Sequence, residues 1–280
     1  MKRPSNDSSV TLMDLEERGP ADYGHRFLDR WLERSGDFSA LPLLSYYQVY
    51  RALVRAKVAA IRAAQEDAAA RTYELAVCDH YLAYAERIMQ PQKRFVVLMH
   101  GVSGAGKSWA SQLLLEATGA VRLRSDVERK RLAGVPAHGQ SRSPIGGGLY
   151  GEAMTEATYA RLAELARAVV EAGYPVVVDA ASLKAWQREM FRRLAGDLGV
   201  PFVLVACAAP GPILRQRVLA RKSAANDASE ADVAVLAQQL RSLEPPGDAE
   251  QAACVEIDTA ALSREEFLAR VALQLSLALR

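Results

Sequence analysis

The chain has 280 residues, enough for one large domain or for a domain with an appendage. Half of its residues are apolar and its formal net charge is only +2, so no global field favours nucleic acid or a membrane surface. No apolar run approaches the roughly 18 residues of a membrane span, and Cys78, Cys207 and Cys254 lack the spacing of a zinc site or disulfide framework. We therefore expect a cytoplasmic protein without a membrane partner.

The first third of the sequence is predicted to be helical. Residues 12–33 indicate a charged helix that is broken at Gly19 and Pro20. Two longer helices follow, each marked by apolar residues at helical spacing: Tyr50, Leu53, Val54, Val58 and Ile61 in the first, and Val77, Tyr81, Tyr84 and Ile88 in the second. We expect a helical hairpin that Pro91 ends, and hence a helical region of residues 1–90 before a domain of residues 91–280.

The second part alternates short apolar strands with amphipathic helices. The predicted strands are residues 95–99, 121–123, 175–178, 202–207 and 254–257, and each is continuous rather than alternating in polarity. Continuous apolar strands are buried on both faces, which predicts a five-stranded parallel sheet between two helical layers, an α/β three-layer sandwich. Residues 158–172 fit one covering helix, because apolar residues form a single stripe along it: Leu162, Leu165, Ala166, Val169 and Val170.

The sharpest motif follows the first predicted strand. Residues 101–108 satisfy G-x-x-x-x-G-K-[ST] between a strand and a helix, the pattern of a P-loop NTPase. Backbone amides of such a loop and the positive end of the next helix bind phosphate, Lys107 reaches the β- and γ-phosphates, and the Ser108 hydroxyl ligates Mg²⁺. The predicted ATP-binding residues are Gly101, Val102, Ser103, Gly104, Ala105, Gly106, Lys107, Ser108 and Trp109.

Two acids follow the next strands, at the edge where parallel sheets bind ligands. Asp126 and Arg129 lie three residues apart after the second strand, and would share one helix face. We predict that Asp126 takes the proton of an acceptor hydroxyl and that Arg129 binds negative charge; a capping aspartate with a surface arginine is the alternative. Asp179 ends the third strand and is predicted to hold Mg²⁺, directly or through water, or to orient the attacking group; a cap of the strand end is the alternative.

A basic helix and a glycine-rich loop complete the candidate site. Arg217 and Arg221 would share one helix face and supply cations to the transition state from a lid, although a solvated basic face is the usual meaning of such a run. Residues 137–151, which include Gly139, Gly146, Gly147 and Gly148, are predicted to form a mobile acceptor loop. His100 abuts the phosphate loop without sequence neighbours that suggest a metal, so we assign it to packing.

Together these residues resemble a family. The phosphate loop, Asp126 with Arg129, the strand that ends at Asp179 and the Arg217 and Arg221 pair resemble AAA-type P-loop kinases grouped with polynucleotide kinase, chloramphenicol phosphotransferase and the zeta-type toxins. The resemblance implies that Asp126 activates the acceptor hydroxyl, that Arg129 contacts the acceptor, and that the two lid arginines contact ATP.

A second resemblance concerns the helical region. Residues 12–19 and 37–57, joined to the P-loop part, are similar to bacterial bifunctional proteins that combine an aminoglycoside phosphotransferase-like part with an ATP-binding part. In those proteins the helical part is the tail of a protein-kinase-like domain. The H-x-D-x-x-x-x-N motif of that domain does not occur in this sequence, so residues 1–90 are expected to be a remnant without kinase chemistry, a scaffold or a surface for a protein partner.

The sequence therefore predicts an ATP- and Mg²⁺-dependent kinase of a hydroxyl on a small molecule or nucleotide. A polynucleotide 5′-hydroxyl stays open as an acceptor, ranked lower because the chain lacks a basic stripe interleaved with aromatic residues. An interaction module that binds ATP without transferring phosphate stays open as well. Such a module does not need an acceptor-side base, so Asp126 distinguishes the two classes.

Overall fold

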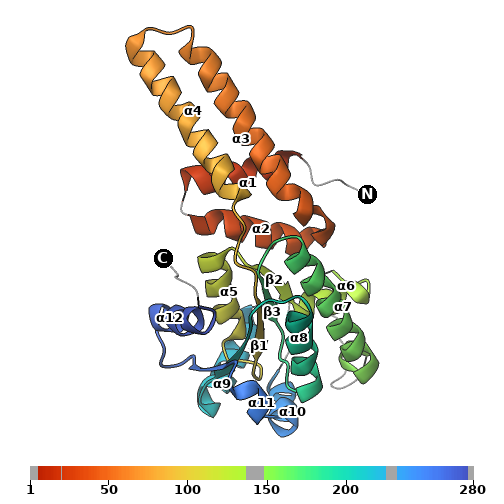
Figure 1. Cartoon of the computed structure of the whole chain (residues 1–280). Coiled ribbons are helices and arrows are strands. Elements are labelled where there is room, and N and C mark those ends of the chain that lie inside the picture. The colour runs from red at the N-terminus through yellow and green to blue at the C-terminus, as the bar shows by residue number, and fades with distance from the viewer. Residues whose placement is uncertain (1–5, 20, 137–147, 225–231, 277–280) are drawn as a thin grey trace. The chain divides into compact units, whose positions relative to one another are not determined.

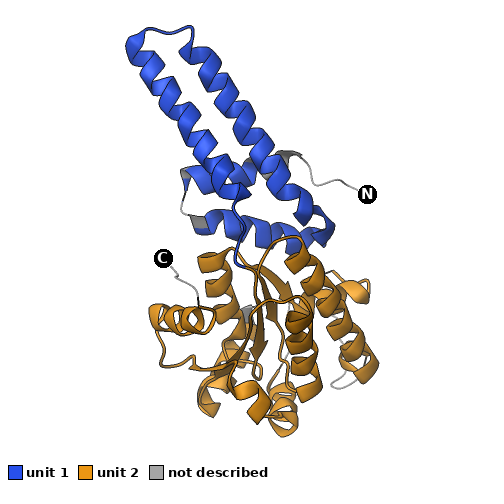
Figure 2. Cartoon of the chain, in the orientation of Figure 1, with its two compact units in different colours: residues 1–93 blue, residues 94–280 orange. Residues whose placement is uncertain are grey.

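The computed structural model describes residues 6–19, 21–136, 148–224 and 232–276. The chain divides into two compact units, residues 1–93 and residues 94–280 (Figure 2). Throughout the described ranges, no helix combines the length and the apolar character that crossing a bilayer requires.

Unit 1 consists of helices. Its elements are α1 (Asn6–Arg18), α2 (Ala21–Ser35), the short 3-10 helix η1 (Phe38–Ala40), α3 (Leu41–Ala63) and α4 (Ala68–Met89). Helix α1 ends at Arg18, directly before the predicted break at Gly19, and α3 and α4 form the predicted hairpin (Figure 1). Asp67 begins α4 as its N-cap, since its carboxylate accepts the N–H groups of Ala69 and Ala70 at 3.1 Å.

The face that α3 buries differs from the one that its large apolar residues suggest. Tyr50, Leu53, Val58 and Ile61 are 43–50% exposed. Alanines are buried instead, at spacings of four and three along the helix: Ala52, Ala56, Ala59 and Ala63. Small side chains allow helix backbones to approach closely, so a row of alanines can form an interface that a search for large apolar residues overlooks.

Unit 2 contains the predicted five-stranded parallel sheet. Its strands are β1 (Val96–His100), β2 (Val121–Arg124), β3 (Val176–Asp179), β4 (Phe202–Ala208) and β5 (Cys254–Asp258), each within one residue of its predicted bounds. The order across the sheet is β2-β3-β1-β4-β5, and every neighbouring pair is parallel. The carboxyl ends of all strands therefore meet at one edge, where β1 lies between β3 and β4.

Helices cover both faces of this sheet, which makes unit 2 the predicted α/β three-layer sandwich. They are α5 (Lys107–Thr118), α6 (Ser125–Leu132), the 3-10 helix η2 (Gly148–Tyr150), α7 (Glu152–Glu171), α8 (Ala185–Asp197), α9 (Gly211–Ala224), α10 (Val233–Ser242), α11 (Asp248–Gln251) and α12 (Arg264–Gln274). Helices α5 and α12 lie on one face, and α7 and α8 on the other (Figure 1).

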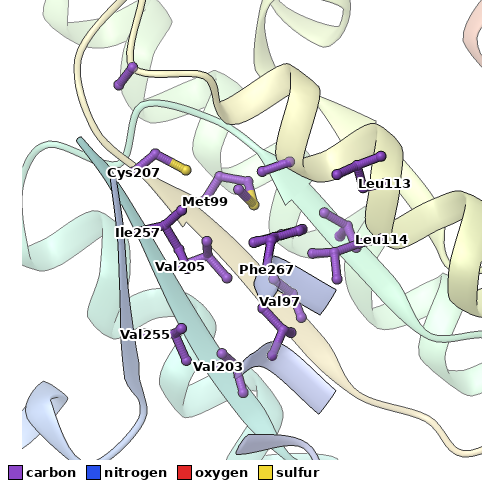
Figure 3. Packing of buried hydrophobic residues seen from close by; sticks show 14 of the residues in the cluster. Val97, Met99, Leu113, Leu114, Val203, Val205, Cys207, Val255, Ile257 and Phe267 are labelled. Atoms are coloured by element: carbon purple, nitrogen blue, oxygen red, sulfur yellow. The ribbon is translucent and has the colours of Figure 1, made fainter. Parts of the chain in front are cut away.

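The main core lies between the sheet and the α5 and α12 layer. Figure 3 shows Val97, Met99, Val203 and Val205 of the central strands gathered with Leu114 of α5, Phe267 of α12 and their neighbours. On the other face, α7 buries the predicted stripe that includes Leu162 and Val169, although the helix begins at Glu152 rather than near residue 158. Burial of each such side chain contributes roughly 1.5–3 kcal/mol, so this core fixes the strand ends that carry the candidate site.

The prediction that every strand is continuously apolar is wrong for β5. Val255 and Ile257 are buried, whereas Glu256 and Asp258 are exposed. Strand β5 is an edge strand with β4 as its sheet neighbour. An edge strand that is covered on one face alternates in polarity, as strands of half-covered sheets do.

Candidate active site

The phosphate loop links β1 to α5 and needs its glycines for steric reasons. Gly101, Gly104 and Gly106 all have positive φ, at 135°, 83° and 88°. A Cβ atom at Gly101 would lie 2.3 Å from the carbonyl oxygen of Cys207, and one at Gly104 would lie 2.7 Å from that of Leu214. Neither position has room for a side chain. Glycine at both positions therefore allows the loop to curl tightly enough to direct its N–H groups toward one point.

Hydrogen bonds from side chains hold this loop. The Lys107 ammonium donates to the carbonyl oxygens of Gly101 at 2.8 Å and Val102 at 2.9 Å. The N–H group of Ser103 donates to the Oε1 atom of Gln239 on α10 at 2.7 Å. Burial lowers the pKa of Lys107, while the charge of Asp179 opposes that shift. Gln239 was not among the predicted site residues.

Six of the predicted residues meet in one cavity of about 100 Å³ at the carboxyl edge of the sheet. They come from five different elements: Ser108 with Lys107 from α5, Asp126 from α6, Asp179 from β3 and Arg221 from α9, and Ser103 of the loop joins them. The cavity thus combines a phosphate-binding loop, two carboxylates and the three cations Lys107, Arg124 and Arg221, the kinds of group that phosphoryl transfer requires.

Other predicted residues lie around this cavity without lining it. Arg217 donates to the carbonyl oxygens of Gly104 at 3.2 Å and Thr259 at 3.0 Å, and so ties α9 to the phosphate loop and to the segment after β5. Trp109 packs against Phe267 with ring centroids 5.7 Å apart. Arg217 and Arg221, predicted as a pair on one face, therefore contact different surroundings.

The oxygen ligands predicted for a metal, on Ser108 and Asp179, suit Mg²⁺, which needs few ligands from the protein. They are too few for a metal that only protein side chains coordinate. Ser108 supplies a hydroxyl and Asp179 a carboxylate to the same cavity. Asp179 is 6% exposed, accepts a hydrogen bond from Ser111 Oγ at 3.3 Å and lies 3.8 Å from Arg124 Nε. No cluster of three or more His, Cys, Asp or Glu side chains with metal-binding geometry occurs in the described ranges. Mg²⁺ commonly takes one or two protein oxygens and completes its shell with substrate phosphates and water.

The segment after β3 is held in an unusual conformation that sequence reasoning missed. Ser182 has a φ of 48°, which a non-glycine residue seldom adopts. Its N–H group donates to the Tyr159 hydroxyl at 2.9 Å, and its carbonyl oxygen lies 2.9 Å from His100 Nδ1. Because a carbonyl oxygen can only accept, Nδ1 is the donor in this contact, and burial lowers the pKa of His100. His100 is thus buried, as predicted, but it also positions this segment.

Arg188 of α8 completes that support. Its side chain is 1% exposed and forms a two-pronged ion pair with Glu250, at 2.7 Å and 2.9 Å. It also donates to the carbonyl oxygens of Ser182 at 3.3 Å and Glu244 at 2.8 Å. The motifs in the sequence gave no signal for it, because its partners lie up to 62 residues away.

A second cavity of about 320 Å³ adjoins the first. Four residues line both cavities: Tyr150, Ala181, Val235 and Gln239. The second cavity is also lined by Arg129, which was predicted to contact the acceptor, and by Trp186. Of the predicted glycine-rich acceptor loop, residues 137–147 lie outside the described residues, whereas Tyr150 reaches both cavities.

A third cavity, of about 660 Å³, lies next to the Gly101 and Val102 end of the phosphate loop. Its lining is mainly apolar, with Ala206, Cys207 and Leu214 among the residues. Neither Lys107 nor Asp126 lines it. Despite its volume, it lacks the pairing of a phosphate-binding cation with a base, so the candidate chemistry belongs to the smaller cavity.

The part of the chain that contains the sheet and the phosphate loop matches a known protein family. Residues 96–246 match the family model described as an AAA domain. The chain belongs to the AAA domain family. The match runs from the start of β1 to the segment after α10 and includes Lys107, Asp126 and Asp179.

The match to curated relatives of this AAA domain protein extends further along the chain. An uncharacterised protein of Mycobacterium tuberculosis is 31% identical over 235 residues, which cover 83% of this chain and 46% of that protein. The chain spans about half the length of the curated relatives it matches. Because 235 residues exceed the length of unit 2, the similarity includes part of unit 1. The resemblance of unit 1 to an aminoglycoside phosphotransferase tail stays a prediction.

Solved structures share the fold of the AAA domain part. A putative kinase from Chloroflexus aurantiacus is 17% identical and superimposes with a TM-score of 0.50 over 67% of this chain and 98% of its own. A sugar kinase from Janibacter is 21% identical with a TM-score of 0.49, over 66% of this chain and 96% of its own. At these identities the likeness concerns the fold.

Proposed function

We propose that the protein transfers the γ-phosphate of ATP, with Mg²⁺, to a hydroxyl group of a small molecule or nucleotide. The observation that supports this most is the shared cavity of Lys107 and Asp126, which brings a phosphate-binding cation and a carboxylate base to one place. A protein that only bound ATP would not require the second group.

On the nucleotide side, the phosphate loop and the amino end of α5 offer backbone N–H groups to the β- and γ-phosphates. Lys107 is poised within the same cavity to exchange its carbonyl partners for phosphate oxygens. Ser108 and Asp179 would hold Mg²⁺, which neutralises phosphate charge when bound. Arg221 adds a further cation to the cavity, while Arg217 donates a hydrogen bond to the loop from outside it.

On the acceptor side, Asp126 orients the hydroxyl and accepts its proton. The acceptor oxygen forms a bond to the γ-phosphorus as the bond from that phosphorus to the bridging oxygen of ADP breaks. The proton passes to the Asp126 carboxylate and from there to water, so charge and atoms balance. Proton transfer to a positioned base contributes typically 10²- to 10⁴-fold to such reactions.

The test is transfer of labelled γ-phosphate to a panel of sugars, sugar acids, nucleosides, antibiotics and 5′-hydroxyl oligonucleotides, with mass detection of the product. Asp126→Asn should lower transfer to the accepted compounds by about 10²- to 10⁴-fold and leave ATP affinity within a few-fold. The control is Asp197→Asn, which changes an exposed carboxylate in the same unit.

Two outcomes would contradict the proposal. ATP hydrolysis that requires no acceptor and survives Asp126→Asn would assign the site to an ATP-dependent interaction module. Transfer to oligonucleotide ends alone would assign it to polynucleotide 5′-hydroxyl phosphorylation.

A further inference from the structure

The cavity of about 320 Å³ beside Asp126 has the features of a binding site for the body of the acceptor. It shares Tyr150 and Gln239 with the cavity that holds Asp126, so a molecule in it can extend a hydroxyl toward that carboxylate. Its volume is at the lower end of the roughly 300–1,000 Å³ typical of small-molecule sites. This inference rests on the proposed kinase function and adds the chemical class of the acceptor.

Arg129 gives this cavity its charge. The residue is 8% exposed and follows Asp126 by one turn of α6. Its Nη1 atom donates to the Leu149 carbonyl oxygen at 2.9 Å and to the Thr155 hydroxyl at 3.2 Å, while its guanidinium carbon lies 5.3 Å from the centre of the Tyr150 ring. One end of the guanidinium is therefore anchored to the protein.

The other edge of that guanidinium is unused within the described residues. Its Nε atom is buried without a hydrogen-bond partner, and no hydrogen bond of Nη2 to a described residue occurs. The Nε and Nη2 edge is one that pairs with a carboxylate or phosphate through two parallel hydrogen bonds. A buried charge without such a partner costs several kcal/mol, which binding of an oxyanion would offset.

The remaining charged side chains of the cavity do not neutralise Arg129. No carboxylate of the described residues lies within 4 Å of its guanidinium nitrogens, and the exposed Glu152 makes no ion pair with it. Lys184, the other cation of the lining, is already paired with Glu244 at 3.0 Å. The charge of Arg129 is thus not paired with a carboxylate of the described lining residues.

Aromatic and amide side chains form the other walls. Trp186 is 42% exposed and packs edge-on against Tyr159, with ring centroids 5.5 Å apart. Gln238 and Gln239 of α10 also line the cavity. Aromatic faces suit a carbon skeleton, and amides suit further hydroxyl groups.

We propose that the acceptor is a small alcohol that carries an oxyanion, either a carboxylate or a phosphate. The oxyanion pairs with the Nε and Nη2 edge of Arg129, the carbon skeleton lies against Trp186, and the hydroxyl reaches Asp126. Asp126 and Arg129 then recognise two ends of one molecule from successive turns of α6.

Matched acceptor pairs test this class directly. Gluconate with glucose, glycerate with glycerol, and a nucleoside monophosphate with its nucleoside differ mainly in the oxyanion. The wild-type enzyme should prefer the anionic member by roughly 10- to 100-fold in kcat/KM, the range for a hydrogen-bonded charged group. The pairs also tell a carboxylate from a phosphate.

Arg129→Gln should remove this preference mainly through KM, and Arg129→Lys should restore part of it. Thr155→Val is the matched structural control, because it removes one anchor of Arg129 and keeps the charge. If Arg129 only joined α6 to α7, Arg129→Gln and Thr155→Val would lower the melting temperature by similar amounts. Both variants would also change kcat/KM equally for the anionic and the neutral member of each acceptor pair. That result would overturn the inference.

A wild-type preference for neutral alcohols, with transfer still dependent on Asp126, would overturn the anionic class and leave the kinase proposal intact. Should no compound accept phosphate, calorimetric titration of the same anions decides, with a non-hydrolysable ATP analogue saturating the phosphate loop. Binding that Arg129→Gln abolishes supports the inference, and failure of the wild-type protein to bind any of the anions contradicts it.

Discussion

The nucleotide side and the acceptor side of the candidate active site differ in the groups that face the ligand: backbone N–H groups of one loop on the first, and side chains from several elements on the second. The phosphate-binding loop of the nucleotide side is a single run, residues 101–108, whose backbone conformation is imposed by glycines that cannot carry a Cβ atom. The acceptor side consists of side chains from α6, η2, α7, the segment after β3, α8 and α10. Backbone N–H groups bind a phosphate whatever the rest of the ligand is. Side chains from separate elements can be substituted one at a time, and each substitution can change which acceptor fits. We infer that specificity depends on the acceptor side.

The largest expected effect comes from the nucleotide side. Lys107→Ala should lower transfer to every acceptor by about 10³- to 10⁵-fold, the range for loss of a cation that stabilises the transferring phosphoryl group. The ratio of kcat/KM values between two acceptors should stay constant, because Lys107 contacts only the common substrate. Steady-state kinetics with at least two acceptors measures both quantities.

Arg215→Ala is the control for that experiment, since this exposed side chain of α9 also carries positive charge but lines neither of the two cavities. A Lys107→Ala variant that altered the ratio between acceptors would break the proposed division between the two sides.

The acceptor side should be the more sensitive to loss of one remote support. Arg188→Ala leaves Glu250 without its partner and frees the carbonyl oxygens of Ser182 and Glu244. Removing one member of a buried ion pair typically costs about 3–5 kcal/mol. Urea denaturation should show this loss in the free energy of unfolding.

Arg193→Ala on the same helix is the matched control. Arg193 is 74% exposed and pairs with Glu189 on the surface, so its removal should cost less than about 1 kcal/mol. Equal losses for the two variants would show that Arg188 does not support the acceptor side as inferred.

The same division explains what could be predicted from the sequence. The phosphate loop is contiguous and Asp126 and Asp179 follow apolar strands, so the parallel sheet and its ligand edge could be predicted from local patterns. Contacts between distant residues could not: Gln239 reaches Ser103 across 136 positions, and no motif marks it. The alanine interface of α3 and the half-covered strand β5 were missed because burial there depends on neighbours that local periodicity does not identify.

A change of pH should weaken the support of the segment after β3. Burial is the main cause that lowers the pKa of His100 below 6.5, and the charges of Arg188 and Lys107 lower it further. The hydrogen bond to Ser182 and the charge of Glu250 oppose this shift. Below pH 6.5 the unfolded chain therefore binds a proton at this position more readily than the folded one, and stability falls as the pH drops from 6.5. His100→Gln should flatten this dependence in urea unfolding between pH 7.5 and 5.5, whereas His80→Gln, at a 60% exposed side chain, should not.

Gln239 belongs to both sides and is expected to give the smallest effect. Its Oε1 atom accepts the N–H group of Ser103, which the proposed function assigns to a phosphate, so the nucleotide must displace it. Gln239→Ala removes this competitor, and ATP affinity should rise by about 2- to 10-fold, the range of one net hydrogen bond. Gln238→Ala is the control, because Gln238 lines only the acceptor cavity of the two and should leave ATP affinity unchanged while raising the acceptor KM. If Gln239→Ala instead weakened ATP binding, Gln239 would contact the bound nucleotide. It would then serve both sides of the site rather than compete with a phosphate for the N–H group of Ser103.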